Sequence, residues 1–146
     1  AEAVRILSQY SERVAVMSGP SFAIDIIKGM PTALVLASTK ASFLRQLQSD
    51  ISMQNFRLYR TSDVIGVELG GALKNIIAIA CGVAIGARKG DSARAALMAR
   101  GFSEMVSFSK AHGAKEKTLS GLSGLGDLSL TCNNQTNPVI SFLVCH

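Results

Sequence analysis

The stretch DVIGVELGGALKNIIAIACGVAIG (residues 63–86) decides the fold, because it has the length of a long helix and an almost unbroken apolar character. It contains no proline, and Lys74 is the single charged residue between Glu68 and Arg88. Such a run without a helix breaker predicts one long helix. Residues 92–112 predict a second helix, so the part of the chain from residue 63 onward is expected to be mainly helical.

The part before residue 63 has a different pattern, in which short apolar runs alternate with helical ones. Three runs predict strands: RVAVMS (residues 13–18), TALVLAS (32–38) and FRLYRT (56–61). Helical patterns accompany them at residues 2–10, 20–28 and 41–47. Strands that alternate with helices predict right-handed crossovers onto a largely parallel sheet. The expected fold is therefore α/β followed by all-α, with the boundary near residue 62.

Single residues mark the expected helix ends. Pro20 suits the first turn of a helix, and Asp91 is the expected N-cap of the second long helix. Gly29 and Gly113 are expected just past helix ends, where glycine takes a left-handed backbone conformation without a penalty. The three strands and the leading helix are interpreted as the end of a larger sheet whose first strands precede residue 1.

Composition narrows the class of protein. Fifteen Lys and Arg against ten Asp and Glu give a net charge of +5, but the basic residues are scattered. Scattered charge is typical of a solvated surface, so we do not expect nucleic-acid binding. Three cysteines without metal-ligand spacing predict neither a metal site nor a disulfide framework, and favour a cytoplasmic protein. The N-terminal sequence lacks the pattern of a signal peptide.

Lys74 is the first candidate functional residue, because an ammonium group in an apolar helix needs water, a carboxylate or a ligand. Gly70 and Gly71 precede it by about one turn and indicate that something approaches closely there. Asn75 adds hydrogen-bonding groups beside it. Two other interpretations remain: a lysine that extends to the surface beside a closely packed helix, and a membrane span, which Lys74, Asn75 and four glycines disfavour.

Two glycine-containing turns are further candidates. Gly19, Pro20 and Ser21 follow a predicted strand, so their backbone N–H groups are expected at the carboxyl end of the sheet, where α/β proteins bind ligands. A plain strand–helix turn fits the same spacing. The run GLSGLGD (residues 121–127) has no strand before it, which excludes a dinucleotide fingerprint. It is interpreted as a tight turn that aims Asp127, with Thr131 on the same helical face, either for substrate hydroxyls or as a helix cap.

Together these segments resemble the bacterial-type NAD(P)-dependent sn-glycerol-3-phosphate dehydrogenases. The matching runs, in the order of the family, are SGPSFA (residues 18–23), GMPTA (29–33), DVIGVELGGALKNIIAIACG (63–82), DSARAALMARG (91–101) and GLSGLGDLSLTC (121–132). The resemblance implies the C-terminal part of a Rossmann-like sheet (residues 1–62) followed by part of a helical substrate domain (63–146). It also implies reversible hydride transfer between dihydroxyacetone phosphate and glycerol 3-phosphate, with NAD or NADP as cofactor, and makes a homodimer a candidate assembly of the complete protein.

Site roles follow from the same resemblance, position by position. Lys74 matches the catalytic acid/base; Gly19, Ser21 and Asp127 match substrate contacts, with Asn75 and Thr131 as weaker matches; Ala23 matches a cofactor contact. Reducing a ketone requires a proton for the developing alkoxide, and a lysine supplies one while stabilising the charge.

The sequence departs from the family at both ends. The strand–GxGxxG–helix motif that seats the cofactor's pyrophosphate has no counterpart before residue 2. From Thr136 onward the chain has TNPVISF (residues 136–142) where the family has Ser-Arg-Asn. We hypothesise that a frameshift near Thr136 made residues 137–146 an aberrant tail. This chain alone is therefore expected to be inactive, and the alternative is a non-catalytic degraded gene product or an interaction module.

Overall fold

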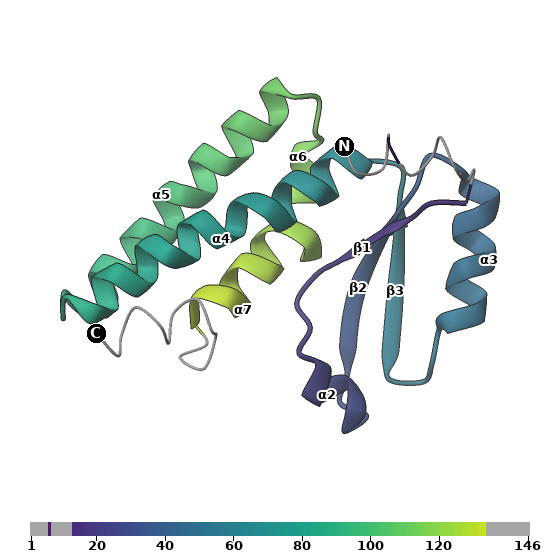
Figure 1. The fold of residues 1–146 in the computed structure, drawn as a ribbon, viewed down its shortest axis with the longest axis horizontal. Coiled ribbons are helices and arrows are strands. Elements are labelled where there is room, and N and C mark those ends of the chain that lie inside the picture. Colours follow the sequence, from purple (N-terminus) through teal and green to yellow (C-terminus); the bar gives the residue numbers. More distant parts are fainter. Residues whose placement is uncertain (1–5, 7–12, 134–146) are drawn as a thin grey trace.

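The computed structural model describes residue 6 and residues 13–133, so the predicted helix over residues 2–10 and the tail over residues 137–146 lie outside its described part, Ile6 excepted. In chain order the elements are β1 (Val16–Ser18), α2 (Ala23–Ile27), β2 (Thr32–Ala37), α3 (Ala41–Ile51), β3 (Phe56–Thr61), α4 (Val64–Gly86), α5 (Gly90–Ala111), α6 (Glu116–Leu119), the π-helical turn η1 (Leu122–Gly126) and α7 (Asp127–Asn133). A small sheet with α2 and α3 is thus followed by helices alone, as predicted (Figure 1).

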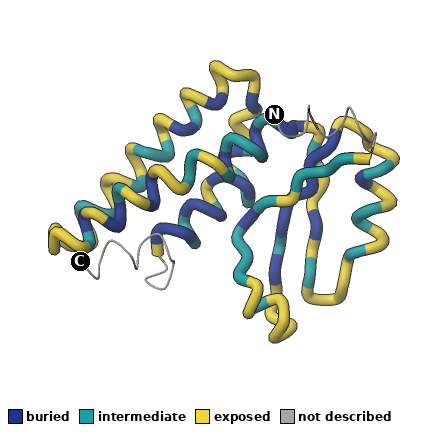
Figure 2. Tube along the Cα trace, in the orientation of Figure 1, coloured by how far each residue is buried: buried dark blue, intermediate teal, exposed yellow. Residues whose placement is uncertain are grey.

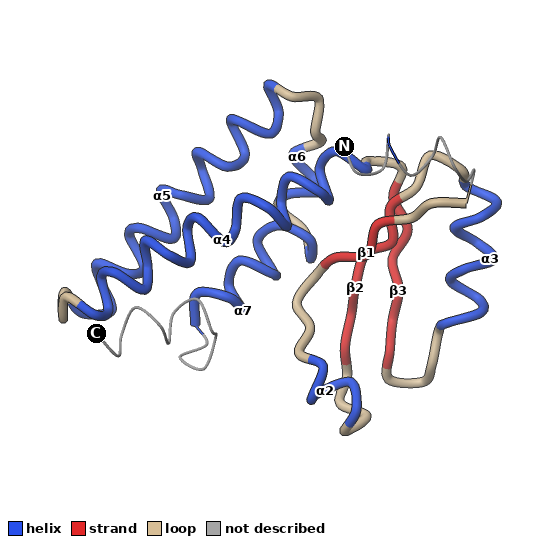
Figure 3. The backbone as a smooth tube through the Cα atoms, in the orientation of Figure 1, coloured by secondary structure: helices blue, strands red, loops and turns tan. Residues whose placement is uncertain are grey.

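The sheet has the strand order β1-β2-β3, and only one of its two pairings is parallel. β2 and β3 run parallel, with Thr32 opposite Phe56. β1 runs antiparallel to β2, with Ser18 opposite Val35, so the prediction of a largely parallel sheet is wrong for β1. Figure 3 shows the three strands beside the helical part of the chain.

The length of α2 explains the direction of β1. A parallel crossover must carry the chain back along the whole strand, usually through a helix. α2 has five residues, or about 7.5 Å at 1.5 Å per residue, whereas six-residue β2 extends over about 20 Å. The chain therefore reverses within residues 19–31. Pro20 also lies outside the helix, which begins at Ala23, contrary to the prediction.

Alternate residues of β2 pack on opposite faces of the sheet. Leu34 and Leu36 contact Leu44 of α3, which covers the outer face. Val35 and Ala37 pack with Val64 and other residues of the first turns of α4, which joins the sheet to the helical part. Figure 2 shows buried residues along β2 and on the facing sides of α4 and α7. This second cluster fixes the position of α4, and with it Lys74, relative to β1.

α4 is the central helix and packs against β1, α5, α6, η1 and α7. Its length and composition would let it cross a membrane, which by itself is weak support for a span. In this fold Ile77, Ala78 and Cys81 of α4 pack instead in a core with Met105 of α5 and Leu128 of α7. The predicted long helix is confirmed, with the Asp63 carboxylate accepting the Gly66 N–H as the cap.

The other predicted helix ends have mixed outcomes. Gly29 and Gly113 have φ values of 68° and 90°, and each lies just past a helix end, as predicted. Asp91 is not the N-cap of α5, because the helix begins at Gly90, and Lys89 is its N-cap without a side-chain hydrogen bond. The Asp91 carboxylate instead pairs with the Arg94 guanidinium one turn later, at 3.1 Å.

Candidate active site

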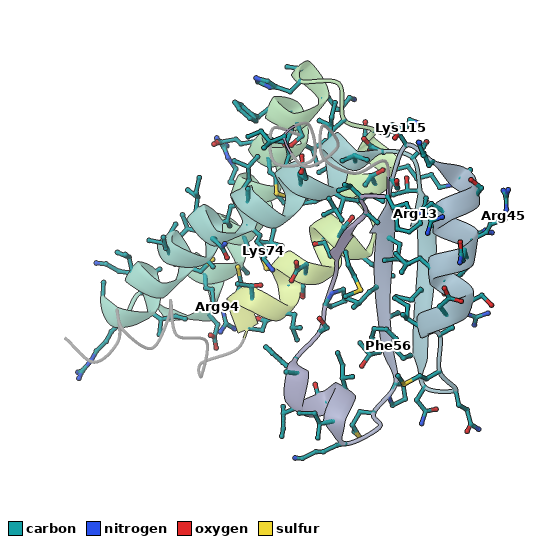
Figure 4. All side chains as sticks on the ribbon, turned by 45° about the vertical axis from the view of Figure 1, so that its right-hand side comes forward. Arg13, Arg45, Phe56, Lys74, Arg94 and Lys115 are labelled. Atoms are coloured by element: carbon teal, nitrogen blue, oxygen red, sulfur yellow. The ribbon has the colours of Figure 1, made fainter. Side chains whose placement is uncertain are left out.

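Lys74 forms an ion pair with Asp127 near the middle of the molecule. The Nζ atom of Lys74 lies 2.5 Å from Oδ2 of Asp127. The Lys74 side chain is 21% exposed and that of Asp127 only 7%, so the pair is shielded from most of the solvent. Lys74 belongs to α4, and its side chain points toward α7, which begins at Asp127 (Figure 4). The lysine of the apolar helix thus has a carboxylate partner rather than an extended position at the surface.

Asp127 reaches Lys74 because the turn before it packs tightly against α4. A Cβ atom at Gly70 would lie 2.5 Å from the carbonyl oxygen of Ser123, so only glycine lets the η1 backbone approach. Within the turn, a Cβ at Gly124 would collide with the carbonyl oxygen of Leu119. The predicted tight turn that aims Asp127 is confirmed, and the close approach expected at Gly70 is that of the chain's own backbone.

Ser18, the last residue of β1, joins this pair and was not predicted. Its Oγ donates to Oδ2 of Asp127 at 3.5 Å. A Cβ atom at Gly71 would lie 3.5 Å from the same Oγ, so Ser18 lies between α4 and the start of α7. In the sequence, Ser18 looks like any other serine at the end of a strand. Only the antiparallel direction of β1 brings it to Asp127. The sole sequence signal was its place beside Gly19.

The turn of Gly19, Pro20 and Ser21 lies next to the pair but not at the carboxyl ends of β2 and β3. Gly19 is buried, and a Cβ there would come within 3.0 Å of Leu34 in the first half of β2. Its φ of 145° also favours glycine. Because β1 is antiparallel, this turn falls beside the first half of β2 instead of its carboxyl end. A Cβ at Gly126 would lie 3.5 Å from the Pro20 ring, which places the turn beside Asp127.

The other predicted site residues differ in their exposure and in their contacts. Ser21 is half-buried and Ala23, at the start of α2, is exposed. Asn75 is exposed, one residue beyond Lys74 on α4. Thr131 is buried and donates its hydroxyl to the carbonyl oxygen of Asp127 at 2.7 Å, so it supports the first turn of α7. The structure thus brings Lys74 and Asp127 into direct contact, and none of the remaining predicted residues contacts Lys74 through a hydrogen bond.

The chemistry that the side chains of this pair can perform is acid–base chemistry. The pair combines a cation that can donate a proton with a carboxylate, and no residue in the described part of the chain donates a hydrogen bond to Oδ1 of Asp127. Within residues 13–133, no group of three His, Cys, Asp or Glu side chains lies close enough together to hold a metal ion. The ammonium group of Lys74 beside the Asp127 carboxylate supports proton transfer as a reaction step.

Two family models match the chain. The model described as NAD-dependent glycerol-3-phosphate dehydrogenase C-terminus matches residues 63–138, which include Lys74 and Asp127. The model described as NAD-dependent glycerol-3-phosphate dehydrogenase N-terminus matches residues 2–44, which include Ser18 and the turn after it. The match to the C-terminal model alone covers more than half of the 146 residues.

Curated relatives and a solved structure agree with these matches. The chain is 62% identical over 121 residues to glycerol-3-phosphate dehydrogenase (NAD(P)+) of Roseobacter denitrificans, which covers 83% of this chain and 38% of the relative. The relative of the same name from Paracoccus denitrificans is 61% identical over 122 residues, 84% of this chain and 39% of the relative. The chain thus spans about two fifths of the length of these relatives.

The crystal structure of glycerol-3-phosphate dehydrogenase from Coxiella burnetii is similar in fold, with a TM-score of 0.86 and 45% sequence identity. The superposition covers 90% of this chain and 40% of that chain. The two family models, the curated relatives and the solved structure therefore all lead to one assignment. The chain belongs to the family of NAD-dependent glycerol-3-phosphate dehydrogenases.

Proposed function

We propose that the complete protein corresponding to this chain interconverts dihydroxyacetone phosphate and sn-glycerol 3-phosphate, with NAD or NADP as cofactor. The observation that carries the proposal is the shielded Lys74–Asp127 pair beside the Gly19–Pro20–Ser21 turn. The names of the curated relatives support the same reaction. When bound, the nicotinamide cofactor supplies or accepts the hydride.

Lys74 acts as the general acid in reduction and the general base in oxidation. As the substrate ketone becomes an alkoxide, its oxygen takes a proton from Nζ, and in the reverse direction the neutral amine takes the hydroxyl proton. The ion pair with Asp127 orients Nζ before the reaction, so no side-chain reorganisation is needed during it. Oδ1 of Asp127 accepts a hydrogen bond from a hydroxyl group of glycerol 3-phosphate.

The remaining substrate contacts come from the surroundings of the pair. The backbone of Gly19 and the hydroxyl of Ser21 donate to substrate oxygens. Their turn lies beside Asp127, because a Cβ added at Gly126 would lie 3.5 Å from the Pro20 ring. Asn75 is exposed next to Lys74 and is a better-placed substrate contact than Thr131, whose hydroxyl already bonds to the main chain.

Ala23 is the described residue that would contact the cofactor. It is exposed at the start of α2, two residues after Ser21, and its small side chain leaves room for a ring or a ribose beside the substrate turn. A methyl group cannot hold a pyrophosphate, so Ala23 fits a neutral part of NAD or NADP and supplies only a small share of the binding.

We propose further that the 146-residue chain alone shows no cofactor-dependent turnover, because it spans about two fifths of its curated relatives. The sheet part ends with β3 at Thr61 and the helical part starts with α4 at Val64, which supports a domain boundary near residue 62. The complete protein would be a cytoplasmic enzyme that acts on a small phosphorylated substrate, with a homodimer as the candidate assembly.

The test is a chimera in which the matched segment of this chain replaces the corresponding segment of the Roseobacter denitrificans relative. Glycerol 3-phosphate should drive reduction of NAD or NADP, and Lys74→Met should lower kcat by about 10²- to 10⁴-fold, the usual contribution of an acid–base group. Lys89→Met, at an exposed lysine beyond α4, is the matched control and should leave kcat unchanged.

Two results would count against these proposals. A folded chimera without glycerol-3-phosphate-dependent cofactor reduction would refute the proposed reaction for these residues. Robust turnover by the purified 146-residue chain would refute the proposal that it is inactive alone.

A further inference from the structure

We propose that Ser18 is a positioning residue that holds the Asp127 carboxylate in place for Lys74, an inference that rests on the proposed function of this pair. Ser18 is the last residue of β1, and its hydroxyl donates to Oδ2 of Asp127 at 3.5 Å. Lys74 donates to the same oxygen at 2.5 Å. Three elements, β1, α4 and α7, thus converge on one carboxylate oxygen.

The backbone around Ser18 allows this approach from both sides. On the side of α4, a Cβ added at Gly71 would lie 3.5 Å from the Ser18 Oγ, an ordinary contact distance, so the hydroxyl lies against α4 without crowding it. On the side of β2, Ser18 is opposite Val35, which packs in the core that anchors α4. Ser18 is therefore held by the β1–β2 pairing on one side and faces the pair on the other.

A neutral donor has a specific use at this carboxylate. When Lys74 transfers its proton it becomes neutral, and its attraction for Asp127 falls sharply. The hydroxyl of Ser18 keeps its proton throughout, so its hydrogen bond holds Oδ2 in both charge states of Lys74.

The role of the hydroxyl can be separated from that of the strand. Ser18 takes part in the β1–β2 ladder through its backbone, which Ser18→Ala retains. Ser38→Ala is a matched control, because Ser38 is a buried serine directly after β2 whose hydroxyl donates to the Val14 carbonyl oxygen at 2.7 Å. It removes one buried hydroxyl without touching the pair.

The first experiment uses the 146-residue chain and measures how fast an amine-acetylating reagent modifies Lys74, with mass spectrometry of the peptides and the exposed Lys89 as internal reference. Asp127→Asn should raise the Lys74 rate about tenfold or more, because it removes the charge that holds the amine. Ser18→Ala should raise it about threefold, and Ser18→Thr should restore the original rate. Ser38→Ala should leave it unchanged.

Two outcomes of this experiment overturn the inference. If Asp127→Asn raises the Lys74 rate and Ser18→Ala does not, the hydroxyl does not position the carboxylate. If neither variant raises it, the pair itself does not protect Lys74 and the inference fails with it. Circular dichroism of each variant confirms that the comparison is made between folded chains.

The second experiment uses the active chimera and separates the inference from the proposed function. Ser18→Ala should lower kcat about tenfold with little change in KM, since it misplaces the acid without removing a substrate contact, and Ser18→Thr should restore kcat. An equal rise in KM with unchanged kcat would show a substrate contact instead and overturn the positioning role. An inactive parent chimera would refute the proposed function, while the acetylation rates still decide the role of Ser18.

Discussion

Lys74 and Asp127 lie 53 residues apart in the sequence, yet their side chains meet at 2.5 Å across the contact between α4 and α7. This single relationship favours one interpretation of the charged residue in the apolar helix. The carboxylate partner of Lys74 is almost fully buried. Lys74 therefore belongs to a functional or structural ion pair and does not extend into solvent. Gly70, four residues before Lys74, allows the close packing that was expected there, because its missing side chain leaves room for the Ser123 backbone.

The Lys74–Asp127 pair should contribute to stability as well as to chemistry. Lys74→Met leaves the Asp127 carboxylate shielded and without its cation, and we expect a loss of about 1–3 kcal/mol in the free energy of unfolding, discounted for the partial exposure of Lys74. Urea denaturation followed by circular dichroism measures it.

The matched control is Lys110→Met, which breaks the Lys110–Glu116 pair at a similar distance of 2.6 Å. Both side chains of that pair are more than half exposed, so its loss should not change the unfolding midpoint measurably. If the two variants behave alike, burial does not strengthen the Lys74–Asp127 pair.

Substitution by alanine should change the stability of the chain in opposite directions at two neighbouring glycines of α4, Gly70 and Gly71. At Gly70 the new Cβ would lie 2.5 Å from a backbone oxygen of Ser123, and the η1 backbone would have to shift; we expect a loss of about 1–3 kcal/mol. At Gly71 the Cβ would meet the Ser18 Oγ at 3.5 Å, an ordinary contact, and the better helix propensity should stabilise the chain by up to about 1 kcal/mol. Thermal unfolding of both variants tests the contrast, and destabilisation by Gly71→Ala would show that the space beside Ser18 is too small for a methyl group.

The sequence predicts the local elements of this fold better than their arrangement. β3 begins and ends at its predicted residues, and α4 follows from an apolar run without proline. The direction of β1 was predicted wrongly, because an apolar run specifies a strand but not the orientation of its neighbour. That orientation depends on how short α2 is, and the helix is shorter than the pattern indicated because Pro20 and Ser21 remain outside it.

The same limit applies to the candidate site. Lys74 could be predicted from the sequence because a charge in an apolar helix is conspicuous, and Asp127 because three glycines precede it. Their contact could not be predicted, since it depends on α4 and α7 crossing at these two residues. Ser18 has no local signal apart from its place beside Gly19, and its position beside Asp127 follows only from the antiparallel pairing of β1.

Asp63 should make the stability of the chain depend on pH in the acid range. Burial raises the pKa of its carboxyl, but hydrogen bonds from Thr118 and from the backbone N–H groups of Lys115 and Gly66, with the charge of Lys115, outweigh it and hold the pKa below its ordinary value. A carboxyl with a lowered pKa in the folded state contributes stability above its unfolded pKa, near 3.8. That contribution is lost as the pH falls through the folded pKa.

Asp63→Asn should therefore flatten the loss of stability with falling pH below about 4, while keeping an oxygen that can cap α4. The measurement is the free energy of unfolding in urea across the acid range, with exposed Asp50→Asn as control. The same slope in Asp63→Asn and in the original chain would show that Asp63 is not the titrating group.

Cys132 should be an unreactive thiol as long as the chain is folded. Burial, followed by the neighbouring thiol of Cys81, raises the pKa of Cys132 to about 12 from an ordinary value of 9.0. A thiol reagent needs the thiolate, so at pH 8 neither access nor ionisation favours reaction. In a Cys145→Ser chain, we expect a maleimide to label Cys81 and Cys132 far more slowly in buffer than in denaturant, as counted by mass spectrometry. Because the folded pKa is the higher one, this thiol stabilises the fold below pH 9.0 and the contribution is lost as the pH rises toward 12. Rapid labelling of Cys132 in buffer would instead show that α7 separates from α4, and with it that Asp127 leaves Lys74 on the same timescale.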